Sequence, residues 1–135
     1  MSKTYNLMDV VKQGSTPPPC DEALGIKASS AEDGVARGIW EVKDTFLNGN
    51  GVVMGGFVSA AADTAMAYAL ASSLKEGQMF ASINLHTTFH RPVRPGQVEF
   101  EARVERLGRT VAYVVASLIQ DGKEVAFSTS SVMVQ

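Results

Sequence analysis

The stretch that decides the fold runs from Met54 to Leu74 and reads MGGFVSAAADTAMAYALASSL. Asp63 is its only charged residue, and every other position is apolar, small or hydroxyl-bearing. A helix that is apolar on every side is expected to lie buried in a core. Burying a carboxylate is costly unless the group is paired or used, so Asp63 is the first candidate functional residue. The alternative is a structural carboxylate that backbone or hydroxyl donors satisfy.

The segment before the helix predicts an N-terminal arm followed by a strand. Residues 1–13 read as a short amphipathic helix, and residues 14–34 are rich in Pro, Gly and Ser, which predicts a loop. Val35 to Val42 has the composition of a strand. We therefore divide the chain into an N-terminal helix and loop, residues 1–34, and one folded domain, residues 35–135.

Beyond the helix the hydrophobic period changes from that of a helix to that of a strand. Residues alternate between apolar and polar from Met79 to His90, which predicts one amphipathic strand. Its polar face would carry Ser82, His86 and His90 together. A lone histidine on a strand is more often structural or solvated than catalytic.

The rest of the chain predicts further antiparallel strands. The segment RPVRPG, residues 91–96, interrupts the pattern, and a second alternating strand follows it. Gly108-Arg109 and Asp121-Gly122 are turn signals that indicate hairpin pairing. Only a sheet that curls around the helix would cover an element apolar on all faces. These features predict an α+β fold of the hotdog type, an antiparallel sheet wrapped around one long central helix.

Size and charge limit the classes of partner. The chain has 135 residues and a formal net charge of −2, with no cluster of Lys or Arg. The electrostatic footprint of a nucleic-acid binder is therefore missing, and DNA and RNA are not expected partners. One domain of this size can bury a core, but an extended binding site would need a second subunit. We therefore expect a homo-oligomer.

Cysteine usage and hydropathy predict the compartment. Cys20 is the only cysteine, which excludes an internal disulfide and gives no metal-ligand spacing with His86 or His90. The N-terminus lacks the features of a signal peptide, so export is not indicated. The run from Gly55 to Leu74 is long enough for a membrane span, but Asp63 near its middle favours a buried core helix. We expect a cytoplasmic protein that uses no metal and no cofactor.

Three motifs carry a resemblance to a known family. They are NGNGVVMGGFVSAAADTAMAYAL at residues 48–70, SINLHTTFHRPVRPG at residues 82–96 and the GRT turn at residues 108–110. Together they resemble the acyl-CoA thioesterases of the hotdog superfamily, in the phenylacetate-degradation (PaaI-like) branch. The likeness spans roughly Val35 to Val134. It implies hydrolysis of an aromatic or medium-chain acyl-CoA by a homodimer or homotetramer that builds its active sites between subunits.

The resemblance also implies a set of site residues. The family pattern is an Asn, a His-Gly-Gly that opens the helix, an Asp further along it and a Ser or Thr on the next strand. The matching residues here are Asn48, Met54, Gly55, Gly56, Asp63 and Ser82. Met54 replaces the usual His, and a thioether can only pack and accept weakly. We expect Met54 to line an apolar part of the pocket.

Physical chemistry gives each residue a role. The amides of Gly55 and Gly56 at the first helical turn can stabilise the negative charge that grows on a thioester carbonyl oxygen. Asp63 can act as general base or nucleophile, and Ser82 can orient water or the carboxylate. Gly56 and Asp63 share a helix face but lie about 10 Å apart along the axis. One carbonyl cannot touch both within a subunit, which predicts a two-fold dimer with shared sites.

The remaining candidates concern substrate binding. Asn48 is a candidate for holding the substrate, or it simply serves its turn. Arg91, Arg94 and Arg109 are candidates for gripping the phosphates of coenzyme A, although at least one is expected to be a solvated surface residue.

Two alternatives to a thioesterase remain open. Because Met54 lacks an imidazole, one alternative is a non-catalytic acyl-CoA binding protein. The other is a hotdog hydratase or dehydratase, which needs a His and a carboxylate that converge on the substrate. We expect neither His86 nor His90 at the helix start, where that chemistry would need one.

Overall fold

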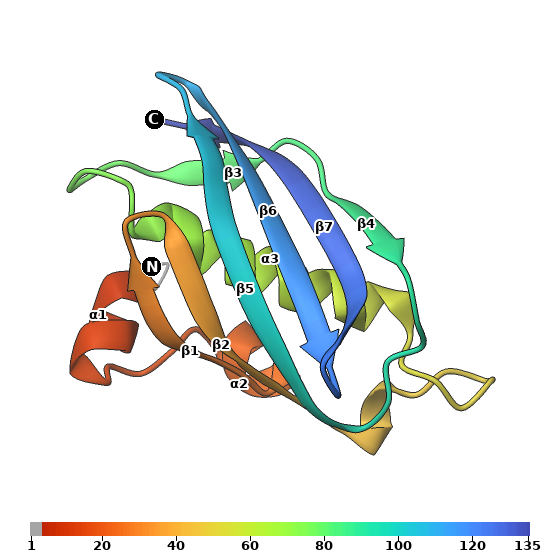
Figure 1. The fold of residues 1–135 in the computed structure, drawn as a ribbon. Coiled ribbons are helices and arrows are strands. Elements are labelled where there is room, and N and C mark those ends of the chain that lie inside the picture. The colour runs from red at the N-terminus through yellow and green to blue at the C-terminus, as the bar shows by residue number, and fades with distance from the viewer. Residues whose placement is uncertain (1–3) are drawn as a thin grey trace.

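One antiparallel sheet curls around a single long helix, α3 (Gly55–Ala71), as Figure 1 shows for the computed structural model. The structure describes residues 4–135, so residues 1–3 of the expected N-terminal helix lie outside the described part of the chain. The predicted α+β hotdog fold is confirmed. The other elements are α1 (Leu7–Gln13), α2 (Pro19–Leu24), β1 (Ile26–Glu32), β2 (Val35–Val42), the 3-10 turn η1 (Asp44–Phe46), β3 (Phe80–Ser82), β4 (His86–Phe89), β5 (Gly96–Leu107), β6 (Val111–Gln120) and β7 (Lys123–Val134).

The strand order explains how the sheet closes over the helix. It runs β1-β2-β5-β6-β7, and β3 and β4 both pair with the outer edge of β7. The chain therefore crosses from one edge of the sheet to its middle between β4 and β5. The predicted hairpin between β6 and β7 is confirmed: Asp121 and Gly122 have φ of 53° and 76°, the two positive values of a type I′ turn.

Small helix residues allow the sheet to approach α3 closely. Ala61, Ala62, Ala65 and Ala69 of α3 are fully buried. The alternation predicted for β5 is also confirmed, because its apolar residues Val98, Phe100 and Ala102 are buried while the intervening ones are not. The core thus lies between the concave face of the sheet and one side of the helix.

The prediction that α3 is buried on every side is wrong for one stripe. Gly56 and Asp63 are exposed, although the residues between them and beyond are mostly buried. The reason is that a single curled sheet covers only part of the circumference of a helix. The uncovered stripe is available to another molecule.

The loop predicted for residues 14–34 is wrong over most of its length. Residues Pro19–Leu24 form helix α2, and Ile26–Glu32 form strand β1, which pairs antiparallel with β2. The sheet therefore begins at Ile26 and not at Val35. The turn between the two strands explains the misreading: Asp33 and Gly34 have φ of 50° and 80°, which makes a tight hairpin out of a sequence read as loop.

The single strand predicted from Met79 to His90 is two strands separated by a bulge. Ser82 lies opposite Val132 and His86 opposite Thr129, so β7 advances one residue less than its partner between these pairs. Asn84 sits in the bulge, where its backbone oxygen accepts from Ser130 Oγ at 2.7 Å.

The bulge reverses the alternation of faces. Ser82 shares the core side of the sheet with buried Val132, whereas His86 lies on the outer side with Thr129. The prediction that Ser82 shares a strand face with His86 and His90 is therefore wrong.

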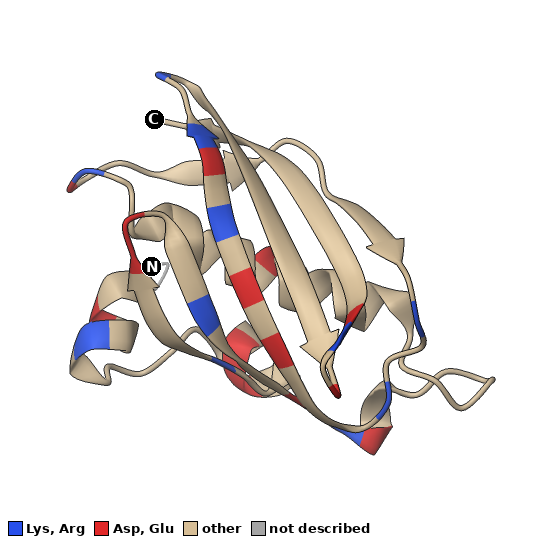
Figure 2. Ribbon diagram, viewed as in Figure 1, with Lys and Arg blue, Asp and Glu red and all other residues tan. Residues whose placement is uncertain are grey.

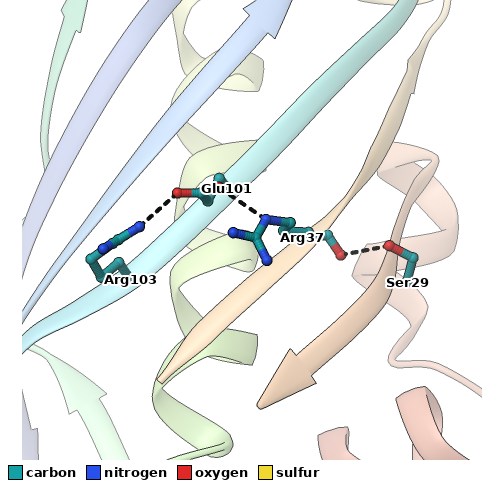
Figure 3. A network of polar contacts seen from close by, with 4 residues as sticks. All are labelled: Ser29, Arg37, Glu101 and Arg103. Carbon is teal, nitrogen blue, oxygen red and sulfur yellow. Dashed lines mark hydrogen bonds and ion pairs between the residues drawn. The ribbon is translucent and has the colours of Figure 1, made fainter. Parts of the chain in front are cut away.

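The outer face of β2 and β5 carries a small polar network, drawn in Figure 3. Glu101 Oε2 pairs with Arg37 Nε at 3.0 Å, Glu101 Oε1 pairs with Arg103 Nη2 at 2.9 Å, and Ser29 Oγ donates to the backbone oxygen of Arg37 at 3.0 Å. The hydrogen bond from Arg103, aided by Arg37, lowers the pKa of Glu101. These groups are exposed, so the pairs contribute little to stability and mark a solvated face.

Candidate active site

The start of α3 presents two unused backbone donors. Met54 is the N-cap residue, and its carbonyl oxygen accepts the amide of Phe57 at 3.0 Å. The amides of Gly55 and Gly56 come before this bond, and no described residue accepts them. Unpaired amides at the positive end of a helix dipole can donate hydrogen bonds to a developing oxyanion.

Side chains pack close to both glycines. A Cβ atom on Gly55 would lie 3.0 Å from Cζ of Phe89, which is tighter than nine in ten real Cβ contacts. A Cβ atom on Gly56 would lie 3.3 Å from the terminal methyl group of Met54. Met54 itself is 47% exposed beside this turn, and it lines neither the pocket that contains Gly55 nor the one that contains Asp63.

A pocket of about 390 Å³ opens at this end of the helix. Its lining residues are Val52, Val53, Gly55, Val58, Phe89, His90, Arg91, Pro92 and Val93. The expectation that neither histidine lies near the helix start is therefore wrong for His90, because the turn after β4 folds back beside Gly55. His90 Nε2 lies 3.7 Å from Glu124 Oε2, so this imidazole already has a partner.

Asp63 lies in a second pocket, of about 310 Å³. Its carboxylate is exposed, and none of the described residues donates to it or pairs with it. Surrounding protein atoms still desolvate it in part, which raises the pKa of the carboxyl above its ordinary value. Ser82 lines the same pocket, so the structure brings these two predicted residues together.

Within one protomer, the structure separates the carboxylate of Asp63 from the helix-start amides. Gly55 lines the first pocket and Asp63 the second, and the two pockets share no lining residue. Their positions on α3 are about two turns apart. A single thioester carbonyl cannot contact both within one protomer.

Asn48 is occupied by its own turn. Its Oδ1 atom accepts from the amides of Asn50 at 2.9 Å and Val52 at 3.3 Å. These bonds hold the loop that leads into α3, as expected for an asparagine in a turn. The side-chain NH₂ group of Asn48 is therefore the part that would donate a hydrogen bond to a substrate.

The three candidate arginines do not lie together. Arg91 lines the pocket that contains Gly55, whereas Arg94 lies in a different depression at the β6–β7 turn. Arg109 is in the turn between β5 and β6, and the length of β5, about 40 Å of strand, separates it from the other two. Within one protomer, Arg109 cannot join Arg91 on a common phosphate.

Sequence reasoning missed a buried polar pair in the Asp63 pocket. Asp21 is 3% exposed, and Tyr68 Oη donates to its Oδ2 atom at 2.5 Å. Cys20 Sγ lies 3.6 Å from the other carboxylate oxygen. Burial raises the pKa of Asp21, although the Tyr68 hydrogen bond partly opposes this shift. Asp21 lay in the segment read as a loop, so no pattern in the sequence could place it.

Two features are absent from the described residues. Residues 4–135 contain no group of three or more His, Cys, Asp or Glu side chains placed to hold a metal ion. No helix in this range is long and apolar enough to cross a membrane.

Comparison with known proteins identifies the family. The family model "Thioesterase superfamily" matches residues 50–127. A Pseudomonas aeruginosa relative, provisionally named an esterase, is 30% identical over 92 residues, which cover 67% of this chain and 68% of the relative. Another provisionally named esterase, from Thermoplasma volcanium, is 38% identical over 50 residues, so the chain spans only 37% of that relative's length.

Solved structures agree with this assignment. A phenylacetic acid degradation-related protein from Ralstonia eutropha JMP134 has a TM-score of 0.88 and 32% identity, with 96% of this chain and 99% of that one covered. The PaaI protein from the phenylacetic acid degradation operon of E. coli has a TM-score of 0.83 and 26% identity, with 95% and 92% covered. By class, the chain belongs to the thioesterase superfamily. Within that class it is similar to the PaaI-like proteins of phenylacetic acid degradation.

Proposed function

We propose that this protein hydrolyses acyl-CoA thioesters with an aromatic or medium-chain acyl group, in a homodimer with two shared sites. One observation carries the proposal: the unpaired carboxylate of Asp63 lines one pocket, and the unpaired helix-start amides lie about two turns away, where Gly55 lines a separate pocket. Each is half of a thioesterase site. A two-fold dimer with antiparallel α3 helices would bring Asp63 of one protomer opposite Gly55 and Gly56 of the other.

The surface of the protomer supports this dimer. The β3–β4 edge of the sheet pairs only with β7, which leaves its other side without a described partner strand. Ile83, Leu85 and Phe89 on this edge are 54%, 37% and 53% exposed. Together with the uncovered stripe of α3, they form an apolar surface that a second copy would bury.

The chemistry follows from the two halves. The thioester carbonyl oxygen accepts hydrogen bonds from the Gly55 and Gly56 amides, which stabilise the charge that grows there. Asp63 takes a proton from water as the water attacks, or attacks the carbonyl carbon itself to give an anhydride that water then cleaves. In both routes the carbon–sulfur bond breaks, and coenzyme A leaves as the thiolate. Ser82, in the same pocket as Asp63, orients the attacking water or the carboxylate.

The substrate class is inferred from the pocket and the relatives. The similarity to proteins of phenylacetic acid degradation supports an aromatic acyl group. In the proposed dimer, Arg91 beside the Gly55 amides is placed to meet the phosphates of coenzyme A.

A non-catalytic acyl-CoA binding protein is the second candidate. It is favoured by Met54, whose exposed thioether occupies the position where the family pattern has an imidazole. Such a protein would bind acyl-CoA in the same place without breaking the carbon–sulfur bond.

The deciding experiment measures thiol release from short, medium-chain and aromatic acyl-CoAs by the wild type and by Asp63→Asn. The variant keeps the shape of the side chain but removes the base, so we expect kcat to fall at least about a hundredfold with the dimer intact. Turnover by the variant within a few-fold of the wild type would make Asp63 structural. Tight acyl-CoA binding by the wild type without thiol release would establish the binding protein.

A further inference from the structure

Two neighbouring pockets lie between the N-terminal segment and α3. The Asp63 pocket has a volume of about 310 Å³, and a second pocket of about 370 Å³ lies toward the C-terminal end of α3, at Ala71 and Leu74. Leu7 and Phe80 line both pockets, and no other described residue does so. Leu7 and Phe80 therefore lie at the boundary between the two spaces, and we refer to them as the partition.

The orientation in which the substrate would bind places its acyl group against this partition. In the proposed dimer the carbonyl lies at the mouth of the Asp63 pocket, held by the Gly55 and Gly56 amides of the second protomer. The coenzyme A portion extends toward the pocket that Gly55 and Arg91 of the second protomer line. The acyl group then points the opposite way, past Ala67 and into the pocket that Phe80 and Leu7 close.

The partition rests on anchored elements. Leu7 is the first residue of α1, whose N-cap Asn6 accepts the amide of Asp9 at 3.1 Å. Leu7, Phe80 and the neighbouring apolar residues of α1 pack against the core. The adjoining wall of the pocket is fixed by the hydrogen bond from Tyr68 to Asp21.

We propose that Leu7 and Phe80 determine the longest acyl chain that the enzyme accepts, by closing the far end of the Asp63 pocket. The inference rests on the proposed thioesterase function and defines its substrate range. A chain that reaches the partition must displace one of the two side chains to extend further. Truncating either side chain joins the two pockets, and each additional methylene that is then buried raises kcat/KM by about fourfold.

The test is the dependence of kcat/KM on acyl length, from butyryl-CoA to palmitoyl-CoA, for the wild type, Leu7→Ala and Phe80→Leu. We expect the ratio of long-chain to short-chain kcat/KM to rise by about tenfold or more in both variants, because two or more extra methylenes find a place. Leu7→Trp should change the ratio in the opposite direction. Met8→Ala is the matched control, because Met8 is also on α1 but lines only the second pocket. The ratio of long-chain to short-chain kcat/KM should stay at the wild-type value in this variant.

A binding measurement separates this inference from the proposed function. Calorimetry with non-hydrolysable acyl-CoA thioethers of the same lengths reports the partition even if no thioester is cleaved. A longer optimum for thioether binding in Leu7→Ala, without turnover by the wild type, would support the partition and refute the hydrolysis. An unchanged length profile in folded Leu7→Ala and Phe80→Leu, or an equal shift in Met8→Ala, would overturn the partition. Far-UV circular dichroism and thermal melting establish that each variant is folded.

Discussion

At the scale of single residues, two carboxylates share one pocket but differ in their surroundings. Asp63 is exposed and has no donor among the described residues, whereas Asp21 is buried and accepts the hydroxyl of Tyr68. Partial desolvation raises the pKa of Asp63, which makes its carboxylate a stronger base than an ordinary aspartate. Asp63 is therefore available for proton transfer, and Asp21 is committed to holding the N-terminal segment.

The raised pKa of Asp63 predicts a pH dependence. The base works only when it is ionised, so kcat/KM should rise with pH as Asp63 loses its proton, with a midpoint above the usual Asp value of 3.8. The measurement is a pH profile of thioester hydrolysis, corrected for the uncatalysed rate. Asp21→Asn is the control, because that carboxylate is not the base and the acid limb should persist without it. If the acid limb of the profile disappears in Asp21→Asn, the group that titrates is Asp21 and not Asp63.

At the scale of elements, one hydrogen bond ties the N-terminal arm to the central helix. Tyr68 lies on α3 and Asp21 on α2, and both side chains are buried. A second link joins the same region to the sheet, because Trp40 Nε1 of β2 donates to the carbonyl of Leu24 at 2.9 Å. The arm is thus part of the core and not an appendage.

Removing the tyrosine hydroxyl should destabilise the protein in a pH-dependent way. Tyr68→Phe leaves a buried carboxylate without its main donor, so we expect a loss of about 1–3 kcal/mol in the free energy of unfolding at neutral pH. Burial already raises the pKa of Asp21 in the folded state, and the folded state therefore favours its protonated form. The loss should shrink as pH falls through that raised pKa, because the buried group becomes neutral.

Urea unfolding of wild type and Tyr68→Phe at neutral and at acidic pH measures this difference. Tyr113→Phe removes the hydroxyl of a tyrosine on β6 that is 42% exposed, and it is the comparison variant. A destabilisation of equal size at both pH values would show that the Asp21 charge does not contribute to it.

At the scale of the whole molecule, the faces of the protomer differ in charge. Figure 2 shows acidic and basic residues in bands along β5, while β6 carries no charged residue and β7 carries charge only at its start. The pairs on β2 and β5 are solvated, which marks that face as exposed to water. The apolar β3–β4 edge and the open stripe of α3 lie elsewhere on the molecule, and they are the surface on which the proposed shared active site depends.

A mixed dimer tests whether activity belongs to the dimer. Asp63→Ala removes the base, and Gly56→Val places a branched side chain at the amides beside Met54. Each homodimer should be inactive. A dimer formed from one chain of each kind retains one site with both halves intact, so we expect it to recover up to about half of the wild-type activity. The measurement uses a purified heterodimer that carries two different affinity tags, and the absence of rescue would rule out a shared site.

The sequence by itself determined the main elements and the residues of chemical interest. The apolar run around Asp63 indicated the central helix, alternation indicated the strands, and the Asp121-Gly122 pair indicated the last hairpin, because these signals are local. The motif comparison also pointed to Gly55, Gly56 and Ser82. Of these, the structure places Ser82 with Asp63 and leaves the glycine amides without a described acceptor.

Only the tertiary structure decided which of these residues meet. The bulge at Asn84 depends on pairing with β7, a strand more than 40 residues away, and it turned Ser82 toward the helix and His86 away from it. β1 was hidden because its pairing with β2 is not encoded in its own composition. The Asp21–Tyr68 contact and the Leu7–Phe80 partition join distant segments, and contacts of that kind follow from packing, which a reading of local periodicity cannot provide.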